Sequence, residues 1–135
     1  MAPWLVYLGR RSTAGFAKIA GVELTLLDCA RYFHKSGGIN GVAQIVKDLG
    51  ANAEPRKLAE AGAHYENSAV RRLGYLLELE GHERQANALK PFVKRAKSMK
   101  PLDPSVRALS ESLDALHEKN SEWKLLINTP VEIDS

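Results

Sequence analysis

The sequence predicts an α+β fold that is predominantly helical, with about five or six helices packed with a small sheet formed by N- and C-terminal strands. Two observations predict this class. Between residues 22 and 120, apolar side chains recur every three or four positions, which is the period of an amphipathic helix. Near both ends lie short runs rich in aromatic and β-branched residues, which are typical of strands.

The strands are expected at residues 3–9, 15–21 and 123–133. In the last run, apolar side chains alternate between two faces, and such a half-buried pattern needs neighbouring strands. Because the other strand candidates lie near the N-terminus, the terminal strands are predicted to pair with each other. Pro130 has no amide hydrogen to donate, so the last strand should end or bend near it.

Three helices are expected in the first half of the chain. The first lies within residues 22–38 and is stopped by the glycine pair at its end. The second has Asn40 as its cap and ends at Gly50. The third has Pro55 in its first turn, where an amide hydrogen is not needed.

A further helix accounts for the stretch "SAVRRLGYLLELEG", with Asn67 or Ser68 as its cap and Gly81 as its stop. Its leucines form a broad apolar face, so it is predicted to lie in the core. A glycine inside a helix costs about 1 kcal/mol relative to alanine, so another backbone or a large ring is expected to pack closely against Gly74. The last helix is expected over residues 102–120, with a stripe of valine and leucine.

Cationic side chains supply the candidate binding residues. Arg71 and Arg72 lie near the N-terminus of their helix, the unfavourable end of its dipole for a cation, so they are expected to have carboxylate or phosphate partners unless they are simply solvated. Residues 84–100 carry six positive side chains and no acidic one, and are predicted to form an amphipathic helix with a lysine edge. The partner- or phosphate-binding set is Arg71, Arg72, Lys90, Lys94, Arg95 and Lys97.

The charge is unevenly distributed along the 135 residues, although the net charge is only +3. Residues 69–102 hold eight Lys/Arg and three Asp/Glu, a net +5, whereas residues 103–135 hold three and seven, a net −4. This pattern is compatible with internal neutralisation or with an anionic partner. The single Cys29 can form no internal disulfide, no apolar run reaches the ~20 residues that span a bilayer, and a cytoplasmic protein without membrane contact is therefore expected.

The sequence argues against an enzyme. The four histidines are dispersed and none has a second histidine at i+4, so no zinc site is indicated. The stretch "KSGGING" matches neither phosphate-binding glycine motif. Cys29 lies between apolar positions and is expected to be a small core residue, while Asp28 and Arg31 are expected to pair on their helix. We expect no catalytic residue, no metal and no cofactor.

Three segments in order carry a resemblance to a known family. The segments "GFAKIAGVELTLLDCARYFHKSGGINGVAQIVKDL", "AVRRLGYLLELEG" and "WKLLINTPVEID" resemble the C-terminal domain of AbiEi-family antitoxins. Proteins of this family are the antitoxin and transcriptional regulator of a bacterial toxin–antitoxin pair, and also have an N-terminal winged helix-turn-helix that binds DNA. The resemblance implies that residues 1–135 are a single antitoxin domain from which this DNA-binding domain is missing.

The same resemblance implies the function. The domain would neutralise a nucleotidyltransferase-like toxin of the AbiEii kind, directly or indirectly, as part of a transcriptional autoregulator. DNA would be bound mainly through the missing domain, with weak non-specific contact from the lysine edge. A stand-alone basic module that binds nucleic acid or protein is the alternative, and a salt-dependent affinity for DNA would distinguish it.

Overall fold

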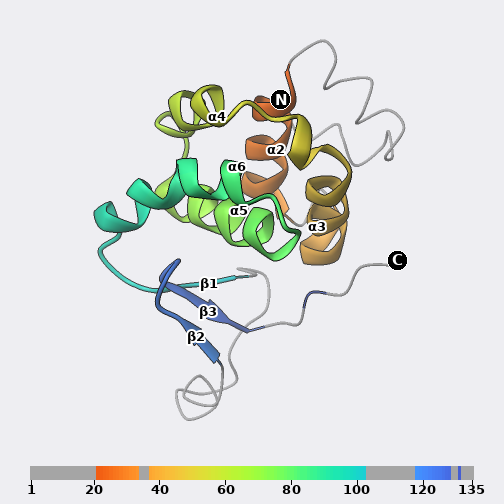
Figure 1. The fold of residues 1–135 in the computed structure, drawn as a ribbon. Coiled ribbons are helices and arrows are strands. Elements are labelled where there is room, and N and C mark those ends of the chain that lie inside the picture. Colours follow the sequence, from red (N-terminus) through yellow and green to blue (C-terminus); the bar gives the residue numbers. More distant parts are fainter. Residues whose placement is uncertain (1–20, 34–36, 103–117, 129–130, 132–135) are drawn as a thin grey trace.

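The computed structural model describes residues 21–33, 37–102, 118–128 and 131. Within them the chain forms five α-helices, two 3₁₀-helices and a small mixed sheet (Figure 1). The helices are α2 (Val22–Arg31), α3 (Gly38–Leu49), η3 (Gly50–Asn52), α4 (Pro55–Gly62), α5 (Asn67–Leu79), α6 (Glu83–Leu89) and η4 (Lys90–Arg95). The strands are β1 (Lys100–Pro101), β2 (Glu118–Asn120) and β3 (Leu125–Ile127).

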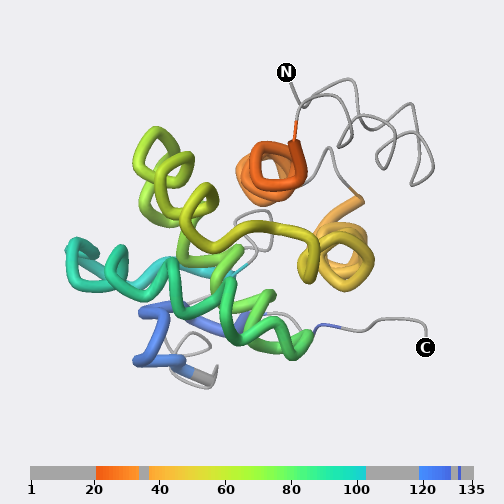
Figure 2. The backbone as a smooth tube through the Cα atoms, turned by 45° about the horizontal axis from the view of Figure 1, so that its top comes forward, coloured from red at the N-terminus to blue at the C-terminus, as the bar shows by residue number. Residues whose placement is uncertain are grey.

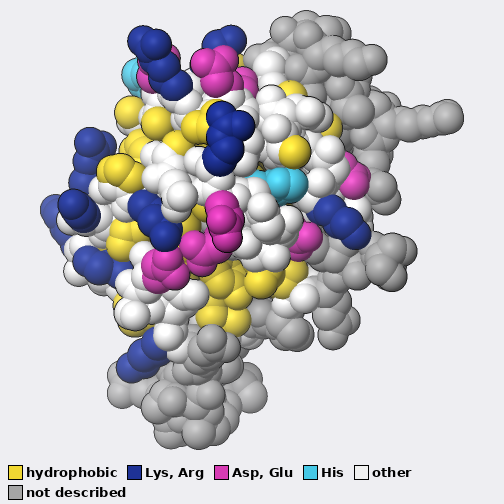
Figure 3. All heavy atoms as spheres, viewed as in Figure 1, with side chains coloured by type: hydrophobic (Ala, Val, Ile, Leu, Met, Phe, Trp, Pro, Cys, Tyr) yellow, Lys and Arg dark blue, Asp and Glu magenta, His cyan; other side chains and the backbone are white. Residues whose placement is uncertain are grey.

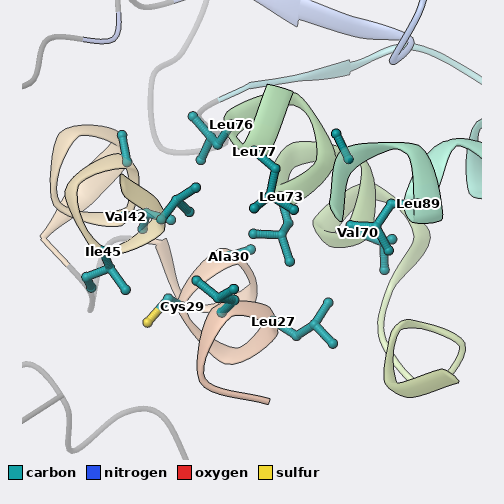
Figure 4. Close-up of a cluster of buried hydrophobic side chains, with 14 of the residues drawn as sticks. Leu27, Cys29, Ala30, Val42, Ile45, Val70, Leu73, Leu76, Leu77 and Leu89 are labelled. Atoms are coloured by element: carbon teal, nitrogen blue, oxygen red, sulfur yellow. The ribbon is translucent and has the colours of Figure 1, made fainter. Parts of the chain in front are cut away.

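Helix α5 is the centre of the helical part, because it packs against α2, α3, α6 and η4. The core fills the space between these helices (Figure 4), where Leu27 and Ala30 of α2 meet Val42 of α3 and Leu73 and Leu77 of α5. All five side chains are buried. Cys29 is buried too, which confirms that it is a small core residue.

The starts of the predicted helices are partly corrected. Helix α3 begins at Gly38 with Gly37 as its N-cap, three residues before the expected cap Asn40, because Gly37 adopts a left-handed φ of 90° that suits glycine. Helix α5 begins at Asn67 with Glu66 as its N-cap, one or two residues before the expected cap at Asn67 or Ser68, and no side chain caps it. The stop at Gly81 is confirmed by its φ of 84°.

The sheet has the strand order β1-β3-β2, with β1 parallel and β2 antiparallel to β3. Leu125 of β3 lies opposite Lys100 of β1 on one side and opposite Asn120 of β2 on the other. The prediction that residues 123–128 pair with N-terminal strands is therefore wrong, because both sides of β3 are occupied by residues 100–101 and 118–120. The expected strand at 3–9 and all of the one at 15–21 except Gly21 lie outside the described residues.

Strand β3 is also shorter than predicted. Trp123 and Lys124 belong to the turn that joins β2 to β3, since the Trp123 amide donates to the side chain of Asn120 at 2.9 Å and Lys124 has a φ of 52°. Most of the helix expected over 102–120 lies outside the described residues, but its last three residues are strand β2. The strands lie beneath the helices in Figure 1 and remain beside α5 in the turned view of Figure 2.

The contact between the sheet and the helices is centred on α5. Trp123 is fully buried, and a Cβ built on Gly74 would come within 2.2 Å of its ring. The expectation that a large ring packs against Gly74 is therefore confirmed. The indole Nε1 of Trp123 also donates to Glu78 Oε1 at 3.3 Å, one turn further along the same helix.

Candidate partner-binding surface

Two of the predicted binding residues, Arg71 and Arg72, point into the protein. They are 2% and 8% exposed. Arg71 donates from Nη1 to the backbone oxygen of Lys124 at 2.6 Å and from Nε to Asn67 Oδ1 at 2.8 Å, and burial lowers the pKa of its guanidinium. Arg72 donates from Nε to the backbone oxygen of Pro101 at 3.0 Å. These arginines join α5 to the sheet, and these three hydrogen bonds go to backbone carbonyls and a side-chain amide rather than to the expected carboxylate or phosphate.

Lys90 lies at the surface but its charge is compensated. Its Nζ is 2.6 Å from Glu122 Oε1 and 3.6 Å from Glu78 Oε2. The hydrogen bond with Glu122 raises the pKa of Lys90, and the same bond lowers the pKa of the Glu122 carboxyl. Lys90 therefore links α5, η4 and the β2–β3 turn, and contributes little positive potential to the surface around it.

The amphipathic helix expected over residues 84–100 is not continuous. The amide of Lys90 already bonds the carbonyl of Asn87, three residues back, and Pro91 has no amide hydrogen with which to extend the α-helical ladder. The chain continues as the 3₁₀-helix η4 and becomes extended at Ala96. The regular lysine edge of a helix is therefore replaced by a turn of η4 and the loop that follows it.

The remaining predicted residues, Lys94, Arg95 and Lys97, are exposed and lie together in this part of the chain. Lys100, also exposed, extends the group, and we call residues 94–100 the cationic segment. Figure 3 shows Lys and Arg atoms gathered along the left edge of the molecule, where Figure 1 draws η4 and the loop to β1. Among the described residues, no carboxylate pairs with these four cations.

Sequence reasoning did not select two residues of the cationic segment. Lys100 belongs to the charge run that drew attention to residues 84–100, so the signal was present. Met99 is 38% exposed between cations, and nothing in its local pattern separates it from a core residue. Arg95 lies over the ring of Phe92, with 5.2 Å between its Cζ and the ring centroid, so its stem is held against the protein.

A groove of about 480 Å³ lies between the start of α2 and helix α4. The acidic side chains on its wall are engaged within the chain, because Glu23 accepts the Glu54 amide at 2.7 Å and Glu60 pairs with Arg56 at 3.2 Å. The lining residues are Gly21, Glu23, Leu24, Lys57, Glu60, Ala61 and His64. These side chains form neither a nucleophile with its base nor a set of metal ligands.

The buried carboxyl group of Asp28 has a different partner from the expected one. Asp28 accepts a hydrogen bond of 2.6 Å from the Tyr65 hydroxyl instead of pairing with Arg31, which lies over the ring of Tyr32. The expected Asp28–Arg31 pair is therefore replaced by a longer-range contact. In the part of the chain that the structure describes, no cluster of three or more His, Cys, Asp or Glu side chains could hold a metal ion. No helix there is long and apolar enough to cross a bilayer.

Comparison with known proteins places the helical part of this structure in a family. The model of the AbiEi antitoxin C-terminal domain matches residues 9–79, just over half of the chain. The match includes helices α2 to α5, while α6, η4 and the sheet lie beyond it. No curated protein and no solved structure matches the chain. The resemblance seen in the sequence is thus confirmed over residues 9–79, and the chain belongs to the AbiEi antitoxin C-terminal domain family.

Proposed function

We propose that this domain neutralises a nucleotidyltransferase-like toxin of the AbiEii kind. The observation that carries the proposal is the family match over residues 9–79, which contains α5 and the three described α-helices α2, α3 and α4. The family is one of antitoxins, so a cognate toxin is the implied partner. The proposal assigns operator recognition to the winged helix-turn-helix of the family and neutralisation to this domain.

No enzymatic step is part of the proposal. The acidic side chains of the groove beside α4 are engaged with their own neighbours, and the hydrogen bond from the half-buried Tyr65 to the buried Asp28 joins the bend between α4 and α5 to helix α2. Neutralisation would then depend on the surface that the domain presents. This makes the fold of the domain, rather than any single reactive group, the requirement for activity.

Rescue from the toxin tests the proposal. Cells that express the toxin encoded beside this chain should grow when the chain is co-expressed, and should stop growing when it is absent. The control is Leu73→Asp, which places a carboxylate in the core and should unfold the domain. Normal levels of folded wild-type chain without any rescue would contradict the proposed function.

A second candidate function, non-specific binding of nucleic acid, is favoured by the cationic segment. Cations without carboxylate partners are free to replace the counterions of phosphates. If three or four phosphates are contacted, the logarithm of the affinity for a short DNA duplex should fall with the logarithm of salt concentration, with a slope of about −3. Changing Lys94, Arg95 and Lys97 together to glutamine should flatten this slope. Tight, sequence-specific binding by the chain would contradict this candidate.

A further inference from the structure

The backbone of the cationic segment is fixed from outside although it has little regular structure of its own. Two residues before its start, the side chain of Asn67 in α5 donates to the carbonyl of Phe92 at 2.8 Å. In its middle, the Nζ of Lys124 donates to the carbonyl of Ala96 at 3.4 Å. Helix α5 and the β2–β3 turn therefore both hold the segment in place.

The far end of the segment is held more firmly. The Lys100 amide donates to the carbonyl of Lys124 at 3.3 Å, and the Leu102 amide donates to that of Leu126 at 2.8 Å. The guanidinium of Arg72 bonds the carbonyl of Pro101, the residue between them. A surface segment that is fixed before binding loses less conformational entropy when a partner docks, so this arrangement favours recognition.

Within the part of the chain that the structure describes, no carboxylate pairs with the cations of the segment, and two acidic side chains of α5 and the β2–β3 turn pair with Lys90 instead. Glu78 and Glu122 both face Lys90, and Glu78 also accepts the indole of Trp123. Four positive side chains within seven residues thus face solvent with no described carboxylate among them. Such a field attracts an anionic surface and accelerates its approach.

The apolar contacts of the segment favour a protein over a nucleic acid as its partner. Single-stranded nucleic acids are bound by stacking bases on exposed aromatic rings, but Phe92 is only 8% exposed and Trp123 is fully buried. Methionine and arginine, in contrast, are enriched where proteins meet, with charged side chains around them. Along the chain, Arg95 lies between Lys94 and Lys97 and Met99 between Lys97 and Lys100, and all five side chains are exposed.

We propose that residues 94–100 form a preorganised docking surface for an acidic protein surface, with Met99 as its apolar contact and Lys94, Arg95, Lys97 and Lys100 as its charged rim. The proposal rests on the proposed antitoxin function, in which the protein partner is the nucleotidyltransferase-like toxin. The surface lies outside the residues that match the family model, so it is a property of this chain rather than of the matched domain.

The test compares two variants with equal loss of positive charge. The docking variant changes all four cations of the segment to glutamine. The matched control changes four exposed cations elsewhere on the described surface, namely Lys47, Arg56, Lys57 and Arg84, to glutamine. Both should give the wild-type urea midpoint within error, because exposed cations contribute little to stability. Binding to the purified toxin is measured at low and high salt, together with rescue in cells.

The docking variant should bind the toxin roughly tenfold more weakly or worse, with a reduced salt dependence, and should rescue poorly, whereas the control should behave like the wild type. Met99→Ala should weaken binding without changing the salt dependence. Equal binding and rescue by the docking variant and the control would overturn the inference and leave the antitoxin function standing. So would rescue by a wild-type chain that forms no complex even on chemical cross-linking.

Two further results separate this proposal from its alternatives. If duplex DNA binding is lost in the docking variant while toxin binding is unchanged, the segment is a nucleic-acid surface and the inference is wrong. If the folded wild-type chain neither binds nor rescues cells from the toxin, the proposed function fails as well, and the inference fails with it. Wild-type rescue is therefore read first, and the difference between the variants second.

Discussion

The ring of Trp123 occupies the position where a side chain on Gly74 would have to lie. A Cβ on Gly74 would be 2.2 Å from Cζ3 and 2.5 Å from Cη2 of the indole. Trp123 comes from the turn between β2 and β3, whereas Gly74 lies in the middle of α5. The missing side chain therefore lets the sheet pack onto the helical part of the domain, and places the β2–β3 turn beside the cationic segment.

Gly74→Ala should lower the free energy of unfolding by about 1–2 kcal/mol. Alanine favours the helix by about 1 kcal/mol, but overpacking against a buried ring costs about 1–3 kcal/mol and more when the ring cannot move. Urea denaturation of the purified domain measures the difference. Trp123→Leu should reduce the cost of the alanine by at least about 1 kcal/mol in a double-mutant cycle, because the two residues are in contact.

Gly62→Ala is the matched control for this prediction. Gly62 is also a buried helical glycine, but a Cβ there would lie 3.4 Å from the tip of the Phe92 ring, which is ordinary contact. Its stability should be unchanged or raised by up to about 1 kcal/mol. Equal destabilisation by both alanines would mean that the closeness of Trp123 is not what requires glycine at position 74.

Arg71→Met should destabilise the domain by about 3 kcal/mol, because methionine keeps the length of the side chain but leaves the Lys124 carbonyl and Asn67 Oδ1 without their charged donor. The loss should be concentrated in the sheet. Hydrogen exchange at the Leu102 amide, which bonds β3, should accelerate more than exchange in α2. Uniform acceleration in all elements would contradict the role of Arg71 as a local link.

Tyr65 predicts a loss of stability at alkaline pH. Burial, the hydrogen bond to Asp28 and the Asp28 charge together raise the pKa of the phenol above its ordinary value of 10.0. Because the folded state favours the protonated phenol, the contribution of the Tyr65 hydroxyl to the free energy of unfolding is complete below about pH 10 and declines as pH rises further. The wild type should lose stability above about pH 10, and Tyr65→Phe should show less of this decline in urea titrations.

Tyr65→Phe should also lower the free energy of unfolding near neutral pH. Asp28 Oδ2 already has no hydrogen-bond partner among the described residues, and Tyr65→Phe also removes the donor to Oδ1. A lowering of about 1–3 kcal/mol in unfolding free energy is expected at neutral pH, since a buried carboxylate loses its donor. Asp28→Asn is the control, because it keeps an acceptor for the Tyr65 hydroxyl and removes the charge.

Local signals predicted the helices better than the contacts between them. The energetic penalty of a glycine inside a helix was enough to predict a ring against Gly74, but not that the ring is Trp123, which is far away in sequence. The partners of β3 were missed for a physical reason. Strand β1 has two residues, too few to show alternation, and β2 is the polar stretch "EKN", which continues a helical pattern.

The candidate surface was predictable only in part. A run of cations without acidic residues pointed to residues 84–100, and Lys94, Arg95 and Lys97 are exposed there. Arg71 and Lys90 could not be separated from them by sequence, because charged residues are usually solvated. Both residues have partners in the β2–β3 turn. The carbonyl of Lys124, which accepts from Arg71, is 53 residues further along the chain, and no local sequence pattern reports a contact over such a separation.

Lys90 should behave differently from Lys94 in binding to duplex DNA, although both belong to the same charge run. The charge of Lys90 is already matched by Glu122 at 2.6 Å and Glu78 at 3.6 Å, so a phosphate gains little from it. Lys90→Gln should therefore leave the slope of log affinity against log salt unchanged, while Lys94→Gln should reduce it by about one, the effect of losing one phosphate contact. Fluorescence anisotropy over a series of salt concentrations measures both slopes. Glu122→Gln provides the complementary check, because it partly releases Lys90 and should make the slope steeper. A slope that responds equally to Lys90→Gln and Lys94→Gln would show that Lys90 is not held by its two carboxylates in solution.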